Sequence, residues 1–389
     1  MDITYGNTIS VMDYNSLRSS AGWEVLPEKK AQVGILNSAY LVSANINNKT
    51  IGMARVIMER KGVEGMIISA SRRTDIPAFY SEWFMNRLRE GYVLTRNPMN
   101  HSQISRINLT PDVIDCIVFW TKDPYSFMDK LPVLDSMGYK YYFQFTLTPY
   151  GREMEQNLRD KKDIIRTFIS LSEAIGKKKV LWRYDPVILN TYYTFGYHKE
   201  MFESLCSQLQ DYTEICTISF VDLYSKLKKQ IKNVDSKSDS PDADGFKIRG
   251  IPEDEMRKLA ANFSEIGKKY GITLRACSEK VDLSEYGIYP ASCIDKGTVE
   301  KVCGYPIAVK HDTNQRPGCG CIQSIDIGAY NTCRNGCRYC YANHGDTSII
   351  KNFDNHCPNS ELLVGAVKDS ETIKTRDIRL LRNDQQKLF

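Results

Sequence analysis

Apolar, strand-like runs alternate with helical segments from Gly65 to Glu279, and this alternation restricts the fold more than any other feature of the chain. The runs are rich in β-branched and aromatic residues, and segments such as SEWFMNRLREGY and EDEMRKLAANFSEIGKKYG separate them. Strands that alternate with helices in this way form parallel βα units. We therefore predict an α/β fold with a full or partial (β/α) barrel of the TIM type. The six runs are GMIISASRRTD, DCIVFWTKDP, YKYYFQFTLTPY, KKVLWRYDPV, EICTISFVD and GITLRACSE.

Polar residues that can take part in chemistry follow each apolar run. Parallel strands bring their carboxyl ends to one edge, and barrel enzymes carry their active sites there. These residues are therefore predicted to line the mouth and bind cofactor and substrate. The alternative is that they begin loops and cap helices, as Thr74 or Asp75 would do before Pro77. The candidates are Arg72, Arg73, Asp75, Lys122, Arg183, Asp185 and Glu279.

The chain has 389 residues, a net charge of +5 and 12 cysteines. Its first residues, MDITYGNTIS, lack the pattern of a signal peptide, and no apolar run approaches the ~18 residues of a membrane span. We therefore predict a cytoplasmic protein that does not enter a membrane. Cytoplasmic thiols are reduced, so this many cysteines indicate metal or redox chemistry rather than disulfides. The mild positive charge permits a nucleic-acid partner without requiring one.

Cys333, Cys337 and Cys340 lie within the segment NTCRNGCRYCYAN. A structural zinc site takes four ligands, whereas three thiolates on a four-iron cube leave one iron open. An open coordination position is what a catalytic metal centre needs. We therefore predict that these three cysteines hold a [4Fe–4S] cluster, with Gly336 relieving backbone crowding beside it.

A second group of four cysteines lies upstream in RACSE, ASCID and PGCGC. Four thiols suit a structural zinc or a second cluster, and Gly318 and Gly320 allow the tight turn that such ligands need. Two alternatives remain: scattered buried cysteines, or one member that completes the ligation of the first cluster and closes it. The four residues are Cys277, Cys293, Cys319 and Cys321.

The C-x₃-C-x₂-C spacing with an aromatic before the last cysteine resembles the radical SAM signature, and GAYNTCRNGCRYCYAN is similar to the spore photoproduct lyase branch. The resemblance implies S-adenosylmethionine as a second cofactor, its reductive cleavage to a 5′-deoxyadenosyl radical, and a reductant such as flavodoxin or ferredoxin. Radical SAM enzymes carry this loop after the first barrel strand, whereas here it follows the last predicted one. If QSIDIGAY completes the barrel, the loop reaches the mouth. Otherwise the loop lies outside, and the cluster serves electron transfer.

Residues 66–389 resemble the bacterial domain-of-unknown-function family 1848 through SASRRTD, NPMN, RYDPV, GCGCIQSIDIGAYNTC and CRYCYAN. This resemblance implies an architecture and a cluster but no reaction. Residues 1–65 resemble the truncated start of a GNAT acetyltransferase, with a helix (YNSLR…GW) and two strands joined at an Asn-Asn-Lys turn. An ordinary α/β extension is the alternative. We predict an extension over 1–65, a barrel over 66–285, a Cys-rich segment over 286–350 that completes or caps it, and a tail over 351–389.

The tail ends in RNDQQKLF, in which Gln385, Leu388 and Phe389 resemble the motif that binds the bacterial sliding clamp. A frayed terminus is the alternative. Three functions are therefore open: a radical SAM enzyme, an iron–sulfur redox or electron-transfer protein, and a zinc-stabilised binding protein associated with DNA. Small molecules, peptides and nucleic acids all stay open as substrates.

Overall fold

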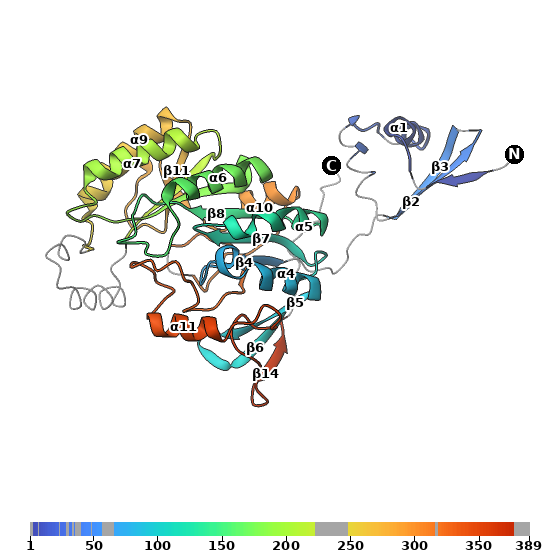
Figure 1. The fold of residues 1–389 in the computed structure, drawn as a ribbon. Coiled ribbons are helices and arrows are strands. Elements are labelled where there is room, and N and C mark those ends of the chain that lie inside the picture. The colour runs from blue at the N-terminus through green and yellow to red at the C-terminus, as the bar shows by residue number, and fades with distance from the viewer. Residues whose placement is uncertain are drawn as a thin grey trace. The chain divides into compact units, whose positions relative to one another are not determined.

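The computed structural model describes residues 66–221, 248–315 and 318–376. It also describes shorter stretches of the first 56 residues (3–6, 8–22, 24–28, 31–32, 35, 40–47 and 49–56). The chain divides into two compact units, Met1–Val63 and Glu64–Phe389 (Figure 1).

The smaller unit carries a three-stranded antiparallel sheet in the order β1-β2-β3. Its strands are β1 (Thr4–Gly6), β2 (Tyr40–Ile46) and β3 (Lys49–Val56), and helix α1 (Val11–Ser20) follows β1. The turn between β2 and β3 contains Asn47 with a φ of 47°, a conformation that asparagine tolerates better than most residues. The predicted helix and the two strands joined at the Asn-Asn-Lys turn are therefore confirmed, while β1 is an addition.

An eight-stranded sheet forms the centre of the larger unit, and all of its neighbouring strands pair in parallel. The order is β12-β11-β10-β9-β8-β7-β4-β13, so the strands follow one another along the chain except that the last lies beside the first. The six predicted strands are confirmed, β13 lies in the segment QSIDIGAY that one prediction requires to complete the barrel, and β12 is a short addition. The strands are β4 (Met66–Ala70), β7 (Ile114–Thr121), β8 (Tyr141–Thr146), β9 (Val180–Val187), β10 (Ile215–Phe220), β11 (Thr273–Cys277), β12 (Tyr289–Ala291) and β13 (Ile325–Asp326).

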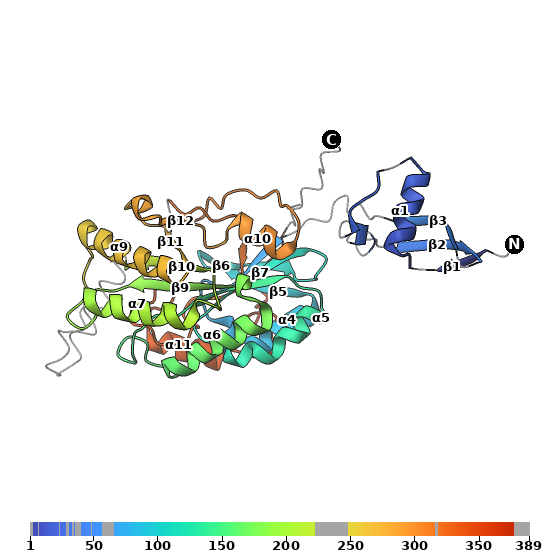
Figure 2. The same ribbon diagram turned by 90° about the horizontal axis from the view of Figure 1, so that it is seen from above.

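Amphipathic helices pack on one face of this sheet through aromatic side chains. Phe145 lies 4.8 Å from Phe168 of α6, and Trp182 stacks on Phe202 of α7 at 5.3 Å between ring centroids. Helix α10 (Lys296–Cys303) lies on the opposite side of the sheet from α6 and α7 (Figure 2). The other helices are α3 (Ile76–Phe79), α4 (Ser81–Glu90), α5 (Leu131–Ser136), α6 (Lys161–Ile175), α7 (Phe195–Leu209), α9 (Glu253–Lys269) and α11 (Asp346–Asp354), with 3₁₀ turns η1 (Tyr125–Lys130), η2 (Lys177–Lys179) and η4 (Ser284–Tyr286).

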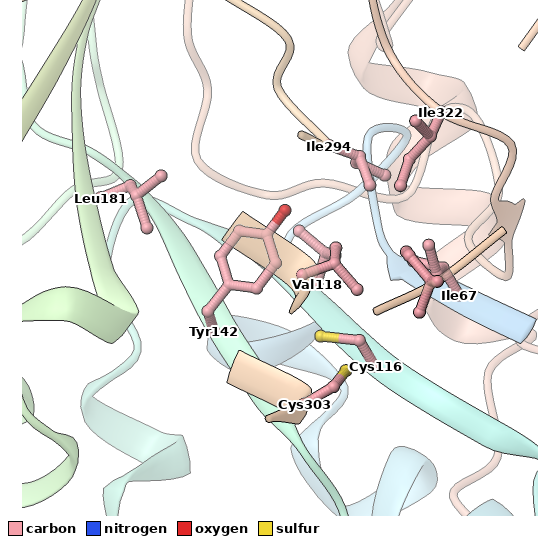
Figure 3. Packing of buried hydrophobic residues seen from close by; sticks show 10 residues of the cluster. Ile67, Cys116, Val118, Tyr142, Leu181, Ile294, Cys303 and Ile322 are labelled. Atoms are coloured by element: carbon pink, nitrogen blue, oxygen red, sulfur yellow. The ribbon is translucent and has the colours of Figure 1, made fainter. Parts of the chain in front are cut away.

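The core under α10 corrects the prediction of a full barrel. Val299 and Cys303 of α10 join one buried cluster with Cys116 and Val118 of β7 and Tyr142 of β8 (Figure 3). A closed eight-stranded barrel fills its interior with strand side chains alone, so it has no room for a helix on this face. Consistent with this, no strand pairing joins β12 to β13 in the described part of the chain. The structure is an α/β fold with an open parallel sheet.

A second sheet joins distant parts of the larger unit. Strand β5 (Tyr92–Asn97) forms an antiparallel hairpin with β6 (Asn100–Asn108), and β14 (Thr372–Thr375) pairs in parallel with β6. The segment that the sequence assigns to a tail is therefore part of the fold as far as residue 376. None of the described helices has the length and hydropathy needed to cross a membrane.

Replacing Val299 tests the packing of α10 on the sheet. Val299→Ala should lower the free energy of unfolding by about 2 kcal/mol, because it removes two fully buried methyl groups and leaves a cavity. Urea unfolding followed by tryptophan fluorescence measures this, since Trp83, Trp120 and Trp182 all lie in the larger unit. Val133→Ala, at an exposed site on α5, is the matched control and should have little effect. Equal, small effects of both substitutions would contradict the packing.

Candidate functional site

A single carboxylate fastens the end of β13 to the end of β4. Asp326 Oδ2 accepts hydrogen bonds from Ser69 Oγ at 2.9 Å and from the Arg72 backbone N–H at 2.7 Å. Its Oδ1 accepts from Ser71 Oγ at 2.6 Å and from the Gly328 N–H at 3.0 Å. The segment QSIDIGAY therefore joins the sheet beside its first strand, as one prediction required. The cysteine loop consequently begins at the carboxyl edge of the sheet.

The loop that carries Cys333, Cys337 and Cys340 is held by backbone contacts with the segment after β8. The Asn157 N–H donates to the Asn335 carbonyl at 3.2 Å, and the Arg338 N–H donates to the Met154 carbonyl at 3.0 Å. Gly336 has a φ of 67°, and a Cβ atom there would lie 2.9 Å from Asn157 Nδ2. The positive φ favours glycine there, and any other residue would also have to displace the Asn157 side chain. The neighbouring chain therefore favours this glycine, whatever the loop binds.

Backbone N–H groups point at two of the three sulfur atoms. The Ala342 N–H donates to Cys340 Sγ at 3.4 Å, and N–H groups of Asn335 and Asn343 reach Cys333 and Cys340. Burial raises the pKa of all three thiols. N–H donors favour the thiolate form, which is the form that binds metals. The donor set therefore fits an iron–sulfur cluster. As the side chains stand, no group of three or more His, Cys, Asp and Glu within the described residues is arranged so that it could hold a metal ion, so both groups of cysteines would have to rearrange to bind one.

Glu155 is a functional candidate that the sequence gives no sign of, because it lies in an irregular segment without a motif. Its buried carboxylate accepts hydrogen bonds from Lys122 Nζ at 2.7 Å and Thr148 Oγ1 at 2.8 Å, and also from the Tyr339 hydroxyl and Lys161. Burial opposes its ionisation, but the two ammonium groups outweigh burial and lower the pKa of Glu155 to about 2. Glu155 thus holds Lys122 beside Cys337, and Lys122 in turn favours the thiolate of that cysteine.

Asp75 acts as a helix cap, as the alternative interpretation proposed. Its Oδ1 accepts from the Ala78 N–H at 3.1 Å at the start of α3. Its Oδ2 accepts from the Lys122 N–H at 2.8 Å and from Asn335 Nδ2 at 3.1 Å. Burial raises the pKa of Asp75 to about 6. Asp75 therefore links β4, β7 and the cysteine loop, and its oxygens are occupied by these contacts.

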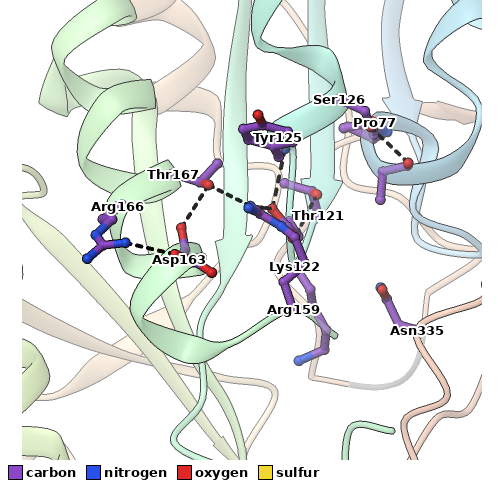
Figure 4. A network of polar contacts seen from close by, with 12 residues as sticks. Pro77, Thr121, Lys122, Tyr125, Ser126, Arg159, Asp163, Arg166, Thr167 and Asn335 are labelled. Carbon is purple, nitrogen blue, oxygen red and sulfur yellow. Dashed lines mark hydrogen bonds and ion pairs between the residues drawn. The ribbon is translucent and has the colours of Figure 1, made fainter. Parts of the chain in front are cut away.

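An ion pair holds the segment after β7 against α6. Arg159 donates to both oxygens of Asp123, at 2.5 and 2.6 Å, and to Thr167 Oγ1 at 2.7 Å (Figure 4). Thr167 lies on α6 and Asp123 directly follows Lys122. This contact therefore fixes the backbone from which Lys122 extends toward the cysteine loop.

Arg183 and Asp185 both lie on β9, and Glu279 follows the end of β11. Arg183 Nη2 pairs with Asp185, which also accepts from the Ser219 hydroxyl. Burial works against the charge of Asp185, but Arg183 outweighs it and keeps the pKa of Asp185 below its usual value. Glu279 Oε1 accepts from the Phe220 N–H at 2.8 Å and so ties β10 to the segment after β11.

Arg72 and Arg73 follow β4 and turn in different directions. The Arg72 guanidinium lies 5.1 Å from the Trp120 ring, whereas Arg73 lies 5.3 Å from the Tyr330 ring and 3.9 Å from Asp326. Arg183 also contacts Trp120, at 5.5 Å. The seven predicted mouth residues therefore do lie along one edge, but they do not form one cluster.

The structure brings the four upstream cysteines together. Cys277, Cys293, Cys319 and Cys321 are all buried and form one cluster against Trp120. The Sγ atoms of Cys277 and Cys293 are 3.0 Å apart. The proposed clamp-binding residues Gln385, Leu388 and Phe389 lie outside the described residues.

Replacing Glu155 should reveal the strength of its contacts with Lys122 and Lys161. A pKa lowered from 4.5 to about 2 corresponds to about 3 kcal/mol of stability at pH 7. Glu155→Gln should remove this contribution in urea unfolding at pH 7. Because the pKa is depressed in the folded state, the difference from the wild type should shrink as the pH falls from 4.5 to 2. Glu173→Gln, at an exposed site on α6, is the control. A difference that does not change over this pH range would contradict the assignment.

Asp326→Asn should loosen the junction that positions the cysteine loop. The amide cannot accept all four of the N–H and O–H donors, so the free energy of unfolding should fall by about 3 kcal/mol. Hydrogen exchange of residues 327–343 should increase more than that of β8 or β9. Asp211→Asn, at an exposed position after α7, should change neither quantity. If hydrogen exchange in Asp326→Asn increased equally throughout the sheet, Asp326 would contribute to overall stability rather than to the position of the loop.

Comparisons with known proteins give a match to one family model and weak likenesses to solved structures, two of which are described. No curated protein matches the chain. A putative alpha-L-fucosidase from Bacteroides thetaiotaomicron is 10% identical, with 50% of this chain and 74% of that chain covered and a TM-score of 0.22. An L-hydantoinase (dihydropyrimidinase) from Arthrobacter aurescens is 8% identical, with a TM-score of 0.25. The match covers 62% of this chain and 49% of the hydantoinase. Likenesses this weak indicate neither fold nor function. The family model described as a domain of unknown function, DUF1848, matches residues 67–342, and the chain belongs to that family.

Proposed function

We propose that this protein is an iron–sulfur enzyme of the radical SAM type. Cys333, Cys337 and Cys340 would hold a [4Fe–4S] cluster, and S-adenosylmethionine would be its second cofactor. The observation that carries this proposal is the position of the three-thiol loop. It follows β13 at the carboxyl edge of the sheet, directly beside the end of the first strand. That is the edge at which parallel α/β folds place their active sites.

The grouping of the other cysteines also supports this function. Four of them contact one another beside Trp120, so they have partners of their own. Three thiols without a fourth would leave one iron of a cluster open to an exogenous ligand. When bound, such a cluster supplies the electron that cleaves a carbon–sulfur bond of adenosylmethionine.

Charged side chains near the loop suit the amino acid part of adenosylmethionine. Asp185 interacts electrostatically with both Lys122 and Tyr341, so these three side chains lie near one another. A carboxylate can bind the ligand's ammonium group, and a lysine can bind its carboxylate. We assign these roles to Asp185 and Lys122, each of which would share its present partners with the ligand: Arg183 and Ser219 for Asp185, and Glu155 for Lys122.

We also propose that the sheet is a barrel left open between β12 and β13. Its strands lie in chain order with the last beside the first, which is the order of a TIM-type barrel. A reducing cytoplasm and a flavodoxin or ferredoxin would supply the conditions and the electron.

Cys337→Ala tests the function directly. The wild-type chain, purified without oxygen, should be brown, carry about four irons per loop cluster, and release 5′-deoxyadenosine from adenosylmethionine with dithionite. The variant should lose this iron and reduce the release to background. Cys357→Ala removes an exposed cysteine and should change neither measurement. Iron without 5′-deoxyadenosine in the wild type would favour a redox protein, and retention of the iron in the variant would show that Cys337 is not a ligand.

A further inference from the structure

Four cysteines from three separate segments converge on one buried point of the larger unit. Cys277 is the last residue of β11, Cys293 follows β12, and Cys319 and Cys321 precede β13. Each is at most 8% exposed, and none is in a disulfide. Buried cysteines are common as single small apolar residues. Four of them meeting in one cluster, with Trp120 packed against it, need another explanation.

The contacts among the sulfur atoms favour one metal ion over an iron–sulfur cube. Cys277 Sγ lies 3.0 Å from Cys293 Sγ, and Cys321 contacts both Cys293 and Cys319. Four thiolates about 2.3 Å from one zinc ion lie about 3.8 Å from one another. The sulfur atoms of Cys277 and Cys293 need to separate by about 1 Å to reach that spacing. A four-iron cube would force them much further apart, because its own atoms would lie between them.

Positive charge and backbone donors surround the cluster. Arg183 Nη1 donates to Cys293 Sγ at 3.2 Å, and the Ile294 N–H donates to Cys321 Sγ at 3.4 Å. Arg72 Nη2 is buried and has no hydrogen-bond partner among the described residues. Four thiolates and one Zn²⁺ have a net charge of −2, which Arg72 and Arg183 would offset in part, since Arg183 is also paired with Asp185. Neutral thiols would leave two buried cations with less compensation, and that arrangement is costly.

The local backbone suits ligands that are separated by a single residue. Gly318 has a φ of 82°, which side chains disfavour. A Cβ atom on Gly320 would lie 2.5 Å from Ser292 Oγ. The two glycines therefore let the PGCGC turn pass close to the segment that carries Cys293. The Ile322 N–H donates to the Ile294 carbonyl at 3.1 Å beside this turn.

We propose that Cys277, Cys293, Cys319 and Cys321 bind one structural zinc ion as four thiolates. The ion would join the segment after β12 to the segment before β13, where the described sheet has no strand pairing. With four protein ligands the ion has no open position, so its role is structural rather than catalytic. This proposal does not depend on the function proposed for Cys333, Cys337 and Cys340.

The test uses the full-length chain with Cys333, Cys337 and Cys340 all replaced by alanine, so that the loop cannot contribute metal. Purified without oxygen, this protein should contain about one zinc per chain and no iron. Adding Cys321→Ser should remove the zinc and lower the melting temperature by about 10 °C. Adding Cys206→Ala instead, at a buried cysteine of α7 outside both groups, should leave the zinc in place.

A second measurement covers the case in which the Cys321 variant does not fold. Cobalt exchanged into the folded triple-alanine protein should give the intense visible absorption of tetrahedral cobalt–thiolate coordination, and added zinc should abolish it. Absence of this absorption, zinc that survives Cys321→Ser, or iron in place of zinc would each overturn the proposal. A Cys277–Cys293 disulfide detected by mass spectrometry in the anaerobic protein would also overturn it. None of these results depends on 5′-deoxyadenosine release, so failure here is distinct from failure of the proposed function.

Discussion

The hydrogen bonds accepted by the Asp326 carboxylate hold β13 beside β4, and the position of the cysteine loop in the larger unit depends on them. The carboxylate accepts hydrogen bonds from residues at the end of β4 and from its own turn. Each hydrogen bond to a charged acceptor contributes about 1.5–3 kcal/mol. Together these bonds hold β13 in place more strongly than the strand pairing of its two residues could do alone. Because these bonds set the direction in which the chain leaves β13, they also determine where the cysteine loop lies.

Two groups of thiols then lie in different electrostatic surroundings. The loop cysteines are close to Lys122, whose ammonium group is held by the buried Glu155. The four upstream cysteines are close to Arg183, which pairs with Asp185. In both places a carboxylate orients a cation toward sulfur, an arrangement that favours thiolates in a buried setting. Such surroundings suit metal binding better than an apolar core does.

Helix α10 explains why the sheet stays open. It packs against Cys116, Val118 and Tyr142 on the face that a closed barrel would fill with strand side chains. The ends of the sheet, β12 and β13, are therefore kept apart by the segment that connects them. The upstream cysteine group lies in this same segment and at the end of β11. The backbone contributes the hydrogen bond from the Ile322 N–H to the Ile294 carbonyl there but no strand pairing, so side chains supply the other contacts between these parts.

The sequence by itself determined the parallel α/β fold, six strands of the sheet, the family, and the two groups of cysteines. These features depend on local periodicity and on spacing along the chain. It did not reveal Asp326, whose partner Ser71 lies more than 250 residues away, or Glu155, whose partners Lys122 and Lys161 share no sequence motif with it. It left open whether Asp75 lines the mouth or caps a helix, and the structure shows that this carboxylate caps α3. Only the tertiary structure decided that the four upstream cysteines meet, because burial and convergence of distant segments leave no periodic trace in a sequence.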